Sequence, residues 1–173
     1  MKPLPLALFA LTLTAQSGPD PNGWQSITWQ MSLAEARAAL DPSASCPVDP
    51  PGSPAIELID RLCTRVQLAG DSVPAYIQTA RSSNHIAAIT IRAADIGDPH
   101  QEATYLELKR LLLEKYAAPK DEHTTRSANG MVESTALWTF PHTSITLTRY
   151  YDPRESTLSL ITIRYRPVTP SPL

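Results

Sequence analysis

The feature that most constrains the fold is an amphipathic helix pattern over residues 98–119 that is followed by strand patterns. Asp98 and Pro99 form a helix start signal, an N-cap followed by proline at the first helical position. Apolar residues then recur at three- and four-residue spacing, which places them on one helix face: Tyr105, Leu108, Leu111, Leu112 and Tyr116. Pro119 ends the helix. Such a stripe must be buried, and its nearest apolar partner in sequence is 131–165.

Three strands are expected after this helix, at 131–140, 143–151 and 156–166, because apolar and polar residues alternate in each of them. Pro-containing dipeptides between these segments predict tight turns. The segment 119–130 is polar and is predicted to be a loop. Residues 167–173 are proline-rich and are predicted to be a disordered tail.

The first half of the chain shows a similar plan. Ser32 and Glu35 have the spacing of a capping box, which predicts a short helix ending at Asp41-Pro42. Strands are expected within 64–68, 73–80 and 85–92, joined by short turns. A short edge strand is expected at 24–29, whereas 55–62 fits either a helical turn or a strand.

The fold class expected from this pattern is α+β in two layers, with helices on one face of an antiparallel sheet and an approximate order α-βββ-α-βββ. The connections between strands are far too short for the crossovers of a parallel sheet. At 173 residues the chain is expected to form a single α+β domain over residues 18–166.

The first residues have the pattern of a signal peptide, predicted as 1–17. Met1-Lys2 supplies a positive start, and the apolar run 4–13 is too short to span a bilayer comfortably. Cleavage is expected after Ser17, with Ala15 as the second choice. The alternatives are an uncleaved anchor or a buried first helix. No cysteine lies near this region, so a lipid anchor is not expected, and we predict a periplasmic or secreted protein without a membrane span.

Cys46 and Cys63 are the only cysteines, and an oxidising compartment favours a disulfide between them. They enclose a proline-rich stretch, where a crosslink contributes roughly 3 kcal/mol by restricting the unfolded chain. Free buried thiols and a catalytic thiol are the alternatives. No neighbouring His or Lys in sequence supports an activated sulfur.

The charge balance excludes one class of partner. The formal net charge is -2, and without Lys2 of the predicted signal peptide 14 basic residues face 17 acidic ones. Nucleic-acid binding requires a basic footprint that this chain lacks, so we expect no nucleic-acid partner.

Two segments carry a resemblance to known proteins. Trp29-Gln-Met-Ser32 opens a short helix, and Lys115-Tyr116-Ala-Ala-Pro119 closes a longer one before a Trp-bearing β-meander. This arrangement resembles small bacterial envelope proteins of unknown role, and its plan is similar to the beta-lactamase-inhibitor-like and outer-membrane-assembly lipoprotein folds. The resemblance implies helices laid on a curved antiparallel sheet. The chain departs from it in lacking a lipobox and in having alanine where glycine is expected, at Ala117 or Ala118.

No motif for nucleophilic, phosphate or zinc chemistry is present, and we expect no cofactor and no metal. The densest cluster of potential metal ligands is at residues 121–123. These residues are adjacent on a predicted loop, so we expect them to be solvated and not to converge on a metal ion. Paired carboxylates could still meet in space, for example Glu133 with Glu155 or Asp152.

The polar face of the second group of strands is the most promising candidate site. Its expected members are Thr135, Thr139, Thr146, Thr148, Tyr150, Thr162, Arg164 and Arg166. Arg and Tyr are favoured anchors at interfaces, and Arg suits carboxylate or phosphate recognition. We name five as binding candidates: Arg164, Arg166, Tyr150, Thr146 and Thr148. The alternative is an ordinary solvated sheet face.

The function expected from these features is a non-enzymatic extracytoplasmic binding module that recognises a protein or envelope component through its sheet face. The alternatives are a small secreted hydrolase with an unrecognised site and a structural envelope protein that associates along a strand edge. Trp24, Trp29 and Trp138 are expected in the core, although Trp24 and Trp29 could instead form an exposed docking pair.

Overall fold

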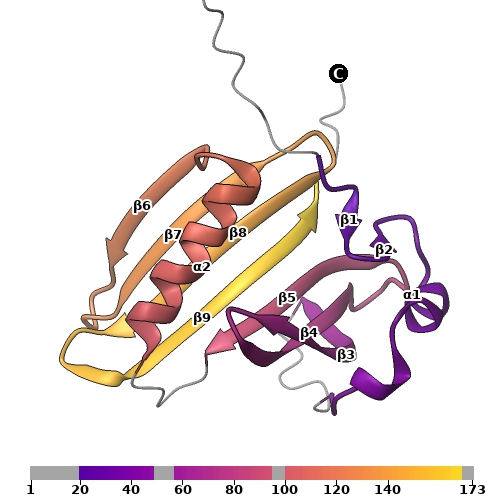
Figure 1. Cartoon of the computed structure of the whole chain (residues 1–173), viewed down its shortest axis with the longest axis horizontal. Coiled ribbons are helices and arrows are strands. Elements are labelled where there is room, and N and C mark those ends of the chain that lie inside the picture. The colour runs from indigo at the N-terminus through magenta and orange to yellow at the C-terminus, as the bar shows by residue number, and fades with distance from the viewer. Residues whose placement is uncertain (1–19, 49–56, 95–99, 169–173) are drawn as a thin grey trace, which may run out of the picture.

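A computed structural model describes residues 20–48, 57–94 and 100–168 of the chain (Figure 1). Its elements are β1 (Gly23–Trp24), β2 (Ile27–Thr28), α1 (Leu33–Ala39), a 3-10 turn η1 (Pro42–Ala44), β3 (Leu58–Leu68), β4 (Asp71–Ala80), β5 (Ile86–Ala94), α2 (Gln101–Tyr116), β6 (Asp121–Arg126), β7 (Val132–Thr139), β8 (Thr143–Asp152) and β9 (Glu155–Pro167). The predicted combination of an antiparallel sheet with helices is confirmed.

The main sheet has seven strands in the order β3-β4-β5-β9-β8-β7-β6, and every neighbouring pair is antiparallel. β3, β4 and β5 form one meander, and β6 to β9 form another. The two meanders meet where β5 pairs with β9, for example Thr90 with Arg164. The final strand in sequence therefore lies in the middle of the sheet.

Helix α2 crosses one face of β7, β8 and β9 (Figure 1). Tyr105, Leu108, Leu112 and Tyr116 of the predicted stripe are all buried, so the stripe is confirmed. The start signal at Asp98-Pro99 lies outside the described residues. At its C-terminal end the helix is fixed to the sheet, because the indole Nε1 of Trp138 donates a 2.9 Å hydrogen bond to the carbonyl of Ala117.

The prediction of a loop over 119–130 was wrong, because residues 121–126 form strand β6. All six of its residues are exposed, so it carries no apolar alternation that sequence could reveal. Its extended conformation comes from pairing with β7, which is a tertiary effect. The second half consequently has four strands where three were expected.

The N-terminal elements follow the local signals in part. The single edge strand expected at 24–29 is instead two short strands, β1 and β2, which pair with each other outside the main sheet. The capping box is confirmed: the backbone nitrogen of Glu35 donates to the Ser32 hydroxyl, and the Ser32 backbone donates to the Glu35 carboxylate at 2.7 Å.

Trp24 and Trp29 are buried, as their expected core role requires, and the Trp29 indole donates to Thr143 Oγ1 at 2.8 Å. The ambiguous stretch ends in a strand, since β3 begins at Leu58.

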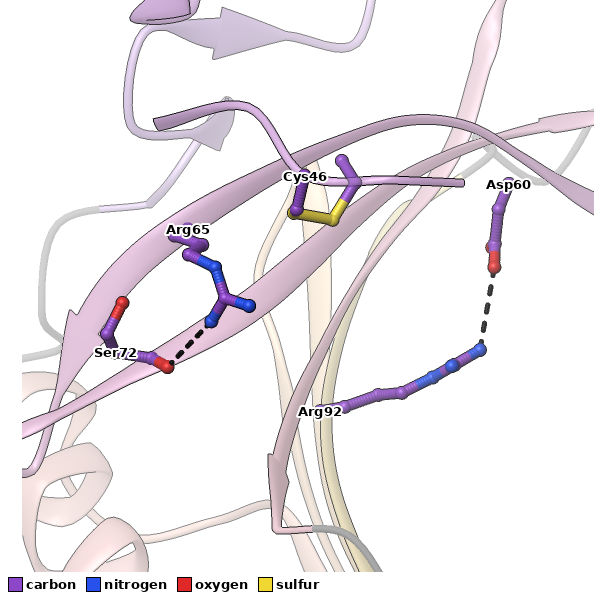
Figure 2. Close-up of a disulfide and its surroundings, with 6 residues drawn as sticks. Cys46, Asp60, Arg65, Ser72 and Arg92 are labelled. Carbon is purple, nitrogen blue, oxygen red and sulfur yellow. Dashed lines mark hydrogen bonds and ion pairs between the residues drawn. A yellow bond between two sulfur atoms is a disulfide. The ribbon is translucent and has the colours of Figure 1, made fainter. Parts of the chain in front are cut away.

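The predicted disulfide between Cys46 and Cys63 is present, with the two Cα atoms 5.0 Å apart (Figure 2). The Cys46 backbone also donates to the Cys63 carbonyl at 3.2 Å, and Ser45 bridges to Thr64. The segment after η1 is thus attached along the outer edge of β3. Among the described helices none is long and apolar enough to cross a membrane. The predicted signal peptide, 1–17, lies outside the described residues.

Candidate functional site

The register of β7, β8 and β9 determines which side chains share the face opposite α2. Thr146 pairs with Arg164, Thr148 with Thr162, and Tyr150 with Glu133. Because side chains alternate along a strand, these residues point away from the buried core that faces α2, whose members on these strands include Ala136, Trp138, Ile145, Leu147, Ile161 and Ile163. The sequence-based assignment of strand faces therefore agrees with the observed register.

A cavity of about 230 Å³ opens on this polar face. We call it the polar-face cavity, and its lining residues are Glu133, Thr135, Thr146, Thr148, Tyr150, Thr162, Arg164 and Arg166. All five binding candidates therefore line the polar-face cavity. Thr139, which was expected on the same face, is exposed and does not line it.

The cavity has a hydroxyl-lined floor and a more exposed rim. Thr135 and Thr148 are buried, while the side chain of Tyr150 is 41% exposed. Burial raises the pKa of Tyr150, and a hydrogen bond to Glu133 together with the negative charge of that carboxylate raises it further. Tyr150 is therefore a neutral phenol beside a carboxylate.

The two arginines are the positive groups of the cavity. Arg164 is half-buried and Arg166 is exposed. Burial lowers the pKa of Arg164, and the positive charge of Arg166 lowers it further. Within the described ranges, no ion pair joins Arg164 or Arg166 to an acidic side chain. Two guanidinium groups thus face the cavity with their charge uncompensated by a direct partner.

Arg164 is attached to a chain of polar side chains that the sequence did not reveal. Its Nε donates to Thr90 Oγ1 at 3.2 Å, and the Thr90 hydroxyl donates to Gln78 Oε1 at 2.9 Å. Gln78 Nε2 in turn donates to Asp60 Oδ1 at 2.7 Å. Arg164 and Thr90 are 74 positions apart in sequence, so only knowledge of the β5–β9 pairing could have connected them.

Other polar clusters do not assemble a site. On β6, His123 Nδ1 lies 2.9 Å from Asp121 Oδ2, but the described residues contain no group of three or more metal-ligating side chains. Asp152, one of the carboxylates considered for catalysis, accepts hydrogen bonds from the backbone and guanidinium of Arg154, which lower its pKa to about 2. A carboxyl held ionised in this way is unsuited to act as a general acid near neutral pH.

Other cavities lie elsewhere among the described residues, and two of them are larger than the polar-face cavity. One of about 490 Å³ lies beside the disulfide, with Arg61 and Val48 in its wall, and the adjoining residues 49–56 lie outside the described ranges. Another of about 290 Å³ lies between α2 and the β1 strand and is lined largely by apolar residues with Lys115. The cavity beside the disulfide contains Arg37 and Arg61 together with the carboxylate of Asp41 and the hydroxyls of Ser45 and Thr64, whereas Lys115 is the single charged residue that lines the apolar one.

No protein-family model matches the sequence, and no curated protein or solved structure matches the chain. The function must therefore be inferred from the residues and their geometry. The polar-face cavity is the site where predicted binding residues, burial and uncompensated charge coincide.

Proposed function

We propose that this protein is a non-enzymatic extracytoplasmic binding module that recognises a protein or envelope component through the sheet face opposite α2. The observation that carries the proposal is the polar-face cavity, where Arg164 and Arg166 have no acidic partner within the described chain. Arginines with Tyr150 at the rim are typical anchors of protein recognition.

Two features support an extracytoplasmic location. The disulfide between Cys46 and Cys63 is of a kind that persists in oxidising compartments. The N-terminal pattern of residues 1–17 is that of a secretory signal. We also infer the two-layer arrangement, because Ala36 of α1 and Leu108 of α2 belong to the same buried cluster. We further propose that the fold is similar to the beta-lactamase-inhibitor-like and outer-membrane-assembly lipoprotein folds.

The proposal is tested by replacing Arg164 and Arg166 together with Ser and comparing capture of envelope partners with the unmodified protein. A matched control replaces Arg65 and Arg126, two exposed strand arginines outside the cavity, and so makes the same change in net charge. We expect the cavity variant to fold and to lose the captured partner, and the control to retain it. Equal capture by both variants would remove this face from consideration.

A second candidate function, association of copies along a strand edge, is favoured by β6. It is the terminal strand of the sheet, and its residues are all exposed. Measurement of molar mass in solution with and without Thr124→Pro, which blocks edge pairing, tests it. A monomeric unmodified protein would exclude this candidate.

A further inference from the structure

The hydrogen-bonded chain behind Arg164 spans four neighbouring strands. Asp60 lies on β3, Gln78 on β4, Thr90 on β5 and Arg164 on β9, in the order in which those strands lie in the sheet. Gln78 is 8% exposed and Thr90 is 4% exposed, so water competes little for their hydrogen bonds. Buried polar groups that are fully paired hold a fixed geometry.

In the series Arg164, Thr90, Gln78 and Asp60, each side chain donates its hydrogen bond to the next residue toward Asp60. Asp60 as a carboxylate can only accept, which orients the Gln78 amide with its nitrogen toward Asp60 and its oxygen toward Thr90. The Thr90 hydroxyl hydrogen is then committed to Gln78, and its oxygen is left to accept from Arg164 Nε. The guanidinium is consequently held through Nε. No hydrogen bond or ion pair to its two terminal nitrogens is present among the described residues, so both remain available as donors.

The negative charge of Asp60 is shared with a different arginine. Asp60 Oδ2 lies 3.5 Å from a terminal nitrogen of Arg92 (Figure 2). The Arg92 guanidinium also lies 4.3 Å from the ring centroid of Tyr76. Arg164 is thus oriented by these hydrogen bonds and forms no direct ion pair with Asp60, although the negative charge of Asp60 acts at a distance to raise the pKa of Arg164 against the effects of burial and Arg166. A group that arrives in the cavity with a negative charge would supply the missing partner.

The charges around the cavity indicate the class of anion. Arg164 and Arg166 contribute two positive charges and Glu133 one negative charge, which leaves a single positive charge to balance. A planar monoanion matches this balance and the fork of terminal nitrogens better than a dianion does. A volume of about 230 Å³ accommodates one functional group and a short side chain.

We propose that the polar-face cavity binds a carboxylate group, received by the terminal nitrogens of Arg164, and that Thr90, Gln78 and Asp60 position this arginine for it. The inference rests on the proposed function and names the chemistry that the face recognises. The hydroxyls of Thr146, Thr148 and Thr162, which also line the cavity, are the neutral donors available to the same group. Thr90 is a positioning residue in this scheme, because it acts through Arg164.

The test is a titration of the purified protein followed by the NMR signal of the Arg164 Nε–H group. The probes are the peptide acetyl-Ala-Glu-Ala-amide, its Gln counterpart as the neutral control, free propionate and inorganic phosphate. We expect the Glu peptide to shift the Arg164 signal saturably and the Gln peptide to leave it unchanged. Saturable binding of propionate with no effect of the Glu peptide would identify a free small carboxylate as the source.

Variants separate positioning from folding. Thr90→Val removes the acceptor of Arg164 and is expected to weaken carboxylate binding by about tenfold, while Thr90→Ser, which keeps the hydroxyl, is expected to bind like the unmodified protein. Arg164→Lys keeps the charge but loses the fork and is expected to weaken binding by at least about tenfold. Unchanged binding in Arg164→Lys would overturn the proposed receptor group, and unchanged binding in a folded Thr90→Val variant would overturn the positioning role.

Two outcomes with the unmodified protein overturn the inference without using any variant. One is tighter binding of phosphate than of either carboxylate, and the other is saturable binding of the Gln peptide that is as tight as that of the Glu peptide. Both leave the proposed function standing if partner capture still depends on Arg164 and Arg166. Failure of that capture test would instead remove the face itself as the binding surface.

Discussion

The two meanders of the sheet are held together by different means. The β6–β9 half has α2 across its face, with Leu108 and Leu112 buried among the strands. The β3–β5 half has the seven-residue helix α1, in which Ala36 is the one buried residue, and it carries the disulfide along the edge of β3. A helix this short buries little apolar area, so in this half the covalent link adds to the packing of the strands themselves.

In the β6–β9 half we expect the packing of α2 against the strands to be the largest single contribution that one substitution can remove. Leu108→Ala should lower the free energy of unfolding by about 4 kcal/mol, because a side chain that is 1% exposed leaves a cavity when truncated. Leu106→Ala on the same helix is the control, since Leu106 is 57% exposed, and it should cost less than about 0.5 kcal/mol. Urea unfolding measures both, and similar losses would show that α2 is not packed as described.

The β3–β5 half should depend instead on its covalent link. Replacing Cys46 and Cys63 together with Ala should lower the free energy of unfolding by about 3 kcal/mol, as expected for a loop with a sequence separation of 17 residues. Reduction of the unmodified protein should reproduce this loss in the same unfolding measurement. A loss below about 1 kcal/mol would mean that packing alone holds this half.

The end of α2 offers a smaller, stabilising change. Ala117 adopts φ 62° and ψ -158°, a conformation that glycine tolerates and other residues adopt only with strain. Ala117→Gly should therefore raise the free energy of unfolding by about 1 kcal/mol. Ala118→Gly is the matched control, because Ala118 has no positive φ, and thermal unfolding should show no gain for it.

The β8–β9 turn provides the smallest and most local test. Hydrogen bonds from Arg154 lower the pKa of Asp152 from 3.8 to about 2. Because the folded-state pKa lies below the unfolded one, the stabilisation is present above about pH 4 and is lost as pH falls toward 2. In Arg154→Gln the pKa of Asp152 should rise toward 3.8, as NMR titration of the carboxyl carbon would show. An unchanged titration would contradict the described pairing.

Sequence predicted those parts of the fold that depend on neighbouring residues. The α2 stripe, the capping box at Ser32 and the alternation in β8 and β9 are local patterns, and each appears in the structure. Strand β6 was not predicted, because its six exposed residues show no alternation of apolar and polar side chains. For the site, the alternation placed Arg164 and Arg166 on the polar face, whereas Thr90, Gln78 and Asp60 depended on pairings between distant strands.

The central position of β9 has a consequence for how the chain must acquire its structure. A ribosome or an export channel delivers residues from the N-terminus onward, so β3 to β8 emerge before the strand that belongs between β5 and β8. Until β9 arrives, both of those strands present open backbone edges that can pair with other chains. Completion of the sheet is therefore a late, long-range event, and a chaperone that shields these edges would protect the nascent protein from aggregation.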